Sequence, residues 1–166
     1  MHKTIFKIFL ILVVLTLIVL GVYYTTKSIK IDTNNLPVNV NYTTTELNLQ
    51  NKELTSLPAE IGNLTQLVKF DVSHNNLTGA LPAEIGRLTK LEILDASHNK
   101  LTGIPAEIGR LTHLQTVDFS NNGITDLPNE IYNLKQLKIL NLSNNPISQE
   151  KIDLLQQKLP STEIIF

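Results

Sequence analysis

The sequence lacks cysteine and tryptophan altogether among its 166 residues. Without cysteine the chain cannot form disulfides, a thiolate nucleophile or a cysteine-ligated zinc site. The same absence excludes the lipid anchor of bacterial lipoproteins, which is attached to a cysteine. Aromatic residues make up only 5% of the chain, whereas apolar residues reach 42%. The core must therefore be built mainly from leucine and isoleucine.

An excess of positive charge is also missing. The formal net charge is −1, but four of the fourteen basic residues, Lys3, Lys7, Lys27 and Lys30, flank the first hydrophobic run. From residue 31 onward, ten basic residues face fifteen acidic ones, a net charge of −5. Because nucleic-acid binding requires a basic patch, this part of the chain is not expected to bind nucleic acid.

Motifs of the common catalytic sites are absent as well. The sequence contains no G-x-S-x-G, no H-E-x-x-H and no phosphate-binding G-x-x-x-x-G-K-[ST]. We therefore expect no catalytic residues, no cofactor and no metal, and we predict that the protein is not an enzyme.

One long hydrophobic run is present, the 17 uncharged residues from Ile8 to Tyr24. As a helix it would be ~25 Å long, and flanking lysines can extend it across a bilayer. The alternative is a cleaved signal peptide, but no small-x-small cleavage pattern follows the run. We expect an uncleaved membrane anchor over residues 1–27 and a stalk with an N-terminal cap over 28–43, including a strand near Val38–Val40.

The distribution of lysines around this run only slightly favours a cytoplasmic N-terminus. The resulting expectation is a single-pass protein of the bacterial plasma membrane whose remaining domain lies on the non-cytoplasmic side.

The rest of the chain is repetitive. Four segments, starting at Leu67, Leu91, Leu114 and Leu137, fit L-x-x-L-x-L-x-x-N-x-L, and a degenerate copy begins at Leu47. Equivalent positions are 23 or 24 residues apart, and Pro-Ala-Glu-Ile-Gly or a close variant recurs between the copies. A period of this length indicates a solenoid.

This pattern resembles the leucine-rich-repeat family over residues 44–166. The resemblance implies a right-handed α/β solenoid of about five repeats, with a concave parallel sheet and short helical turns on the convex side. It also implies a ladder of asparagines that satisfy backbone groups in the turns after the strands, namely Asn75, Asn99, Asn122 and Asn145. Lys52 takes that position in the first copy, which predicts an edge or capping unit.

The motif between the copies suits one or two helical turns, with proline at the first helical position and glycine ending the turn. Tyr132 replaces that glycine in the last copy, which predicts a longer turn. Residues 148–166 are expected to cap the C-terminal end. There, Ser148 would begin a helix reaching about Lys158, and a half-strand would follow with Ile164 and Phe166 facing inward.

In proteins that this sequence resembles, ligands usually contact the concave sheet. The strand positions that alternation leaves exposed are the candidate partner-binding residues, Glu46, Asn48, Lys69, Asp71, Ile93, Asp95, Thr116, Asp118, Ile139 and Asn141. Serines such as Ser73, two positions further along, are expected on the same face. Three stacked aspartates repel one another and would favour a partner with a basic segment. The alternative is that they are ordinary solvated strand residues.

Two further features each have two interpretations. His74 and His98 are equivalent residues of adjacent repeats, so they are either surface residues or half of a metal site, and the first interpretation is favoured. Ile93 and Ile139, with Ile165, are either contact anchors for a partner or aliphatic residues packed against their neighbours.

The sequence thus predicts a membrane-anchored module that binds a protein or peptide through its concave face. Two alternatives remain, a structural or adhesion protein of the cell envelope and a regulatory subunit of a membrane enzyme. The residues do not identify the partner or the biological process.

Overall fold

The computed structural model describes residues 43–166. The hydrophobic run 8–24 and the strand expected near Val38–Val40 lie outside the described residues. Within the described part of the chain, no helix is long and apolar enough to cross a membrane.

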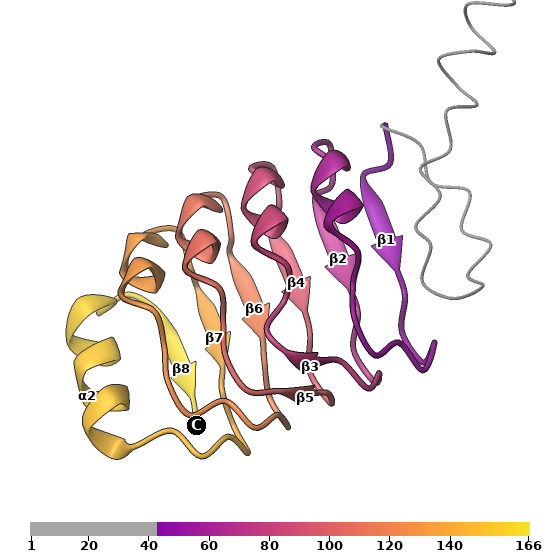
Figure 1. Cartoon of the computed structure of the whole chain (residues 1–166). Helices are drawn as coiled ribbons and strands as arrows, with labels where there is room; N and C mark the ends of the chain where they lie inside the picture. Colours follow the sequence, from indigo (N-terminus) through magenta and orange to yellow (C-terminus); the bar gives the residue numbers. More distant parts are fainter. Residues whose placement is uncertain (1–42) are drawn as a thin grey trace, which may run out of the picture.

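The main element of the fold is a parallel sheet of six strands, which lie side by side in the order in which they occur in the chain (Figure 1). Each strand has three residues, with a central side chain facing the core and two outer ones facing away. The register joins Leu47, Phe70, Leu94, Val117, Leu140 and Ile164 in one row. The strands are β1 (Glu46–Asn48), β2 (Lys69–Asp71), β4 (Ile93–Asp95), β6 (Thr116–Asp118), β7 (Ile139–Asn141) and β8 (Glu163–Ile165).

Four 3-10 turns line up on the other side of the core (Figure 1), η1 (Ala59–Asn63), η2 (Ala83–Arg87), η3 (Ala106–Arg110) and η4 (Asn129–Asn133). In each turn the proline is the N-cap residue and not the first helical residue, so the turn begins one position later than predicted. A glutamate lies in each first turn, where it complements the partial positive charge of the helix start.

The glycines of these turns allow close packing between neighbouring repeats. A Cβ at Gly109 would lie 2.4 Å from the Glu130 carbonyl oxygen, and one at Gly62 would lie 2.6 Å from the Glu84 carbonyl oxygen. The predicted role of ending the turn is therefore replaced by a steric one. No further 3-10 turn follows η4 in the described residues, so Tyr132 fits there, and η4 has the same five residues as the others instead of being longer.

Leucine and isoleucine fill the interior between sheet and turns, as expected. One continuous cluster of buried side chains runs from Leu47 to Leu159, and Phe70 and Phe119 are its largest members. A short second sheet, β3 (Thr78–Gly79) with β5 (Lys100–Leu101), links two connecting segments and was not predicted from the sequence.

The asparagine ladder is present and joins consecutive repeats. The Asn75 side-chain oxygen accepts hydrogen bonds from the backbone N–H groups of Lys52 and Leu54, both at 3.0 Å. Its amide nitrogen donates to the carbonyl oxygens of Leu49 and Val72 at 2.9 Å. Asn99, Asn122 and Asn145 bridge their neighbours in the same way. Lys52 occupies the equivalent position in the first repeat, and β1 is the edge strand of the described sheet, as predicted.

The C-terminal cap matches the prediction except at its last residue. Helix α2 (Gln149–Lys158) follows Ser148 and buries Ile152 and Leu155, and Leu159 directly after the helix is also buried. Ile164 is half-buried, but Phe166 is 57% exposed and does not face inward. The reason is that β8 ends at Ile165, so the alternation of the strand no longer directs the side chain of the following residue.

Candidate functional site: the open face of the sheet

We call the side of the six-stranded sheet that faces away from the 3-10 turns the open face, and it is the side predicted to be concave. The strand register places all ten candidate residues there in two columns. The first column runs Glu46, Lys69, Ile93, Thr116, Ile139 and Glu163. The middle column runs Asn48, Asp71, Asp95, Asp118, Asn141 and Ile165.

Three of the four serines that follow the middle column, Ser73, Ser97 and Ser120, are buried, contrary to the expectation that they line the open face, and the fourth, Ser143, is half-buried. Ser73 is 1% exposed, and its backbone N–H and hydroxyl both donate to Asp71 Oδ1 at 3.0 and 2.7 Å. Ser97 bonds Asp95 Oδ1 in the same way. These bonds direct the serine side chain back toward its own strand, and they hold the Oδ1 atom of each aspartate in place.

The second carboxylate oxygens differ along the column. Asp71 Oδ2 accepts a long bond of 3.5 Å from the amide of Asn48, and Asp118 Oδ2 accepts one of 2.9 Å from Asn141. Asp95 Oδ2 has no hydrogen-bond or ion-pair partner among residues 43–166. Because aspartates flank it on both sides, this oxygen is where the open face most favours a cation.

The aliphatic residues of the open face differ in exposure. Ile93 is 38% exposed and lies two residues before Asp95 on β4, so both side chains point to the same face. Ile139 is half-buried, and Ile165 is 40% exposed at the end of the middle column. An exposed aliphatic side chain therefore lies on the same strand and face as Asp95, whose second carboxylate oxygen has no partner among the described residues.

His74 and His98 stack at the end of the strands, with ring centroids 4.2 Å apart and planes 10° from parallel. Asn121 donates to His98 Nε2 at 3.3 Å, and Asn144 donates to Asn121 at 3.0 Å, which extends the row over four repeats. All four residues have positive φ, a conformation in which asparagine and histidine are enriched. The sequence places Asn121 in the same column as the two histidines, but the hydrogen-bonded row that continues to Asn144 was not predicted, although the positive-φ preference was a usable signal.

The stacked geometry does not create a metal site by itself. The ring faces, and not the nitrogen lone pairs, point at each other in this arrangement. In the described part of the chain no group of three or more histidine or acidic side chains is placed to hold a metal ion.

A shallow hollow on the convex side was not anticipated. It lies between η3 and η4 and is lined by Ala106, Glu107, Gly109, Arg110, Glu130 and Asn133. Its walls are charged and open to solvent, which offers little of the enclosed apolar surface typical of small-molecule sites.

Comparisons with known proteins agree with this architecture. The family model described as leucine rich repeat matches residues 43–101 and 90–147. A leucine-rich-repeat protein of Leptospira interrogans is 36% identical, with a TM-score of 0.61 over 75% of this chain and 38% of that chain. No curated protein sequence matches the chain.

Two plant receptors are also similar. The ectodomain of the receptor kinase SOBIR1 from Arabidopsis thaliana is 27% identical, with a TM-score of 0.59 over 72% of this chain and 66% of that chain. The plant peptide hormone receptor RGFR1, solved with RGF2, is 30% identical, with a TM-score of 0.60 over 73% of this chain and 20% of that chain. This chain thus spans less than two thirds of the length of these structures.

Proposed function

Because the chain belongs to the leucine-rich repeat family, we propose that it is a membrane-anchored module that binds a protein or peptide through the open face. The observation that carries the proposal is the pairing, on β4, of an exposed isoleucine with a carboxylate oxygen that has no partner in the described residues. The chain acts by binding and not by catalysis in this account.

Similar structures support a binding role. RGFR1 was solved in complex with RGF2, and the receptor kinase ectodomain of GASSHO1 from Arabidopsis thaliana was solved with Casparian strip integrity factor 2. Six strands at a spacing of about 4.8 Å make an open face ~24 Å wide, which spans about seven residues of an extended peptide. The module therefore has room for a short segment, and we expect an affinity in the micromolar range unless several copies act together.

The charge of the open face favours a basic segment. Asp71, Asp95 and Asp118 follow one another on adjacent strands, and only the outer two have an amide neighbour bonded to their second oxygen. An arginine or lysine beside Asp95 would relieve repulsion within this column and gain a charge-assisted hydrogen bond.

Ile93 adds an apolar contact next to that charge. Its exposed side chain would be covered by an aliphatic residue of the partner, and covering a branched aliphatic side chain contributes about 1–2 kcal/mol. We therefore propose that the preferred segment combines a basic residue with an adjacent aliphatic residue.

Selection from a random peptide library tests this preference. The full chain in mild detergent would be the bait, with Asp95→Asn as a variant of the open face and Arg110→Gln as a matched variant of the convex side. We expect the wild type and Arg110→Gln to enrich peptides with a basic and an aliphatic residue, and Asp95→Asn to lose this enrichment. Enrichment of acidic peptides, or equal enrichment by Asp95→Asn, would contradict the proposal, and binding without any preference would favour a structural or adhesion role.

The membrane part of the proposal rests on the uncharged run 8–24 with its flanking lysines. We propose that this run is the anchor and that the repeats lie outside the cytoplasm. Protease added to intact cells should then digest the repeats, as it does after the cells are opened. Digestion only after opening would place the repeats inside the cell and exclude extracellular partners.

A further inference from the structure

One ladder asparagine precedes a glycine, and Asn122-Gly123 is the only Asn-Gly pair in the chain. Residues 76, 100 and 146, which follow the other ladder asparagines, are asparagine, lysine and proline. Glycine has no Cβ to hinder its backbone nitrogen, so this pair is the chain's most reactive site for intramolecular loss of the side-chain amide. We propose that Asn122 is a spontaneous modification site that the folded repeat protects and that local opening of the repeat exposes.

The chemistry needs only water. The backbone nitrogen of Gly123 attacks Cγ of Asn122, the Cγ–Nδ2 bond breaks, and the displaced nitrogen takes up the Gly123 amide proton and leaves as ammonia. The resulting five-membered imide is then opened by water at one of its two carbonyl groups. The product is aspartate, or isoaspartate when the main chain now runs through the former side chain.

Both reacting groups are held by hydrogen bonds in the folded repeat. The Gly123 N–H donates to the Leu101 carbonyl oxygen at 2.8 Å, and the Leu101 N–H donates to Asn122 Oδ1 at 2.9 Å. Asn122 Nδ2 donates to the carbonyl oxygens of Ala96 and Phe119 at 3.1 and 2.9 Å. The attack requires these bonds to break, so it must wait for the repeat to open.

The fold does not require glycine at this position. A Cβ on Gly123 would meet its nearest neighbour, the Leu101 carbonyl oxygen, at 3.4 Å, an ordinary contact distance. Its φ is not in the positive region that favours glycine. The equivalent residues Asn76 and Lys100 carry side chains, and Gly123→Ala is therefore a matched variant that alters the chemistry and preserves the fold.

Conversion of the amide would destabilise the closed repeat. The carbonyl oxygens of Ala96, Phe119 and Ser120 accept hydrogen bonds from Asn122 Nδ2, and in the product they would face a carboxylate that cannot donate. Ala96 belongs to the preceding repeat, so the lost bonds include one that joins two repeats. The modification is irreversible, so a chain that has opened and reacted keeps the altered residue.

Peptide mass spectrometry measures the reaction directly. The full chain would be incubated in mild detergent at slightly alkaline pH, with and without urea, beside Gly123→Ala under the same conditions. We expect conversion of Asn122 to be at least about tenfold slower in the folded chain than in urea, because reaction requires opening. In urea we expect Gly123→Ala to react at least about tenfold more slowly than wild type, because its Cβ hinders the attack. Equal rates in either comparison would overturn the proposal.

The effect on the fold has its own test. Asn122→Asp imitates the aspartate product, and Asn144→Asp places the same charge on an exposed residue of the next repeat. We expect the melting temperature of Asn122→Asp to fall below that of Asn144→Asp. Equal melting temperatures of Asn122→Asp and Asn144→Asp would show that the aspartate product does not destabilise the repeat, which would contradict the proposed effect on the fold.

Discussion

The ladder asparagines show how much one side chain can contribute in a repeat protein. Asn75 is 7% exposed, and its single amide group serves five backbone groups of two repeats. Since these groups are shielded from water, few alternative partners are available to them. The stability of the junction between repeats therefore depends on a residue that sequence inspection would otherwise class as polar and expendable.

We predict that Asn75→Ala lowers the free energy of unfolding by about 2–4 kcal/mol, because it leaves several buried backbone groups without partners. Urea unfolding followed by circular dichroism would measure the change. Asn63→Ala is the control, since Asn63 is exposed at the end of η1, and it should change stability by less than about 0.5 kcal/mol. Equal effects of the two substitutions would show that the ladder bonds contribute nothing.

Sequence reasoning reached these asparagines through the repeat pattern but misjudged residues that lie just beyond the ends of the strands. The serines after the middle column were expected on the open face, yet Ser73 is buried because its hydroxyl bonds Asp71. Phe166 was expected inside, yet it lies beyond the end of β8. Alternation along a strand predicts the side to which a residue points only while the strand continues.

At the scale of elements, the glycines of the 3-10 turns set the distance between repeats on the convex side. Three consecutive turns each place a glycine against the backbone of the next turn. The sequence suggested that these glycines end the helical turn, and only the contact with the following coil reveals their steric role. Since no further 3-10 turn follows η4 in the described residues, this close contact is not required there and Tyr132 is tolerated.

We predict that Gly109→Ala destabilises the protein by about 1–3 kcal/mol, because its Cβ would overlap a backbone carbonyl that cannot move without shifting the whole turn. Gly103→Ala is the matched control, since a Cβ there meets nothing within 4 Å. It should be neutral or more stable by up to about 1 kcal/mol. If Gly109→Ala were as stable as Gly103→Ala, close approach of the turns would not limit the fold.

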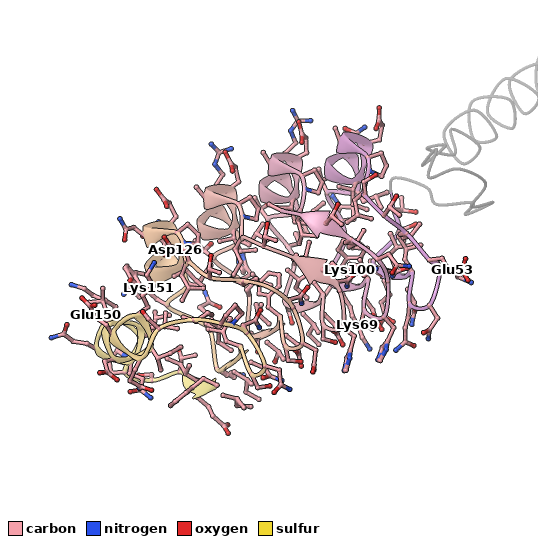
Figure 2. The ribbon with its side chains drawn as sticks, turned by 60° about the horizontal axis from the view of Figure 1, so that its bottom comes forward. Glu53, Lys69, Lys100, Asp126, Glu150 and Lys151 are labelled. Atoms are coloured by element: carbon pink, nitrogen blue, oxygen red, sulfur yellow. The ribbon has the colours of Figure 1, made fainter. Side chains whose placement is uncertain are left out.

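The C-terminal cap is tied to the preceding repeat by an ion pair between Lys151 of α2 and Asp126, and Figure 2 shows the two side chains together. The hydrogen bond from Lys151, followed by one from the backbone of Leu127, lowers the pKa of the Asp126 carboxyl below its ordinary value of 3.8. A carboxyl with a lowered pKa stabilises the fold at pH values above 3.8 and loses this contribution as the pH falls through its lowered pKa.

We therefore predict that Asp126→Asn lowers the melting temperature slightly near neutral pH, and that its difference from wild type disappears as the pH falls below about 3.8. The effect should be small because both side chains are exposed to solvent. Glu150→Gln on the same helix is the control, since Glu150 forms no ion pair within the described residues. A difference that grows on acidification would have the wrong sign for this account.

For the whole molecule, periodicity made the fold predictable and left the partner undetermined. Leucines recurring every 23 or 24 residues are sufficient to predict a stacked parallel sheet, because each coil can bury its apolar side only against its neighbours. The residues that line the open face could be predicted in the same way. A preference for a basic segment was also predicted from the stacked aspartates, but the sequence does not single out Asp95. Its second carboxylate oxygen, which has no partner among the described residues, becomes apparent only when the hydrogen bonds of all three aspartates are compared.

The most direct test of a binding open face is the affinity of one library-selected basic peptide, measured by calorimetry with three forms of the full chain. We predict that Asp95→Asn weakens binding at least about tenfold, the effect of losing a charge-assisted hydrogen bond. Arg110→Gln, on the convex side, should bind as wild type does. Unchanged affinity for Asp95→Asn, or an equal loss for Arg110→Gln, would contradict recognition through the open face.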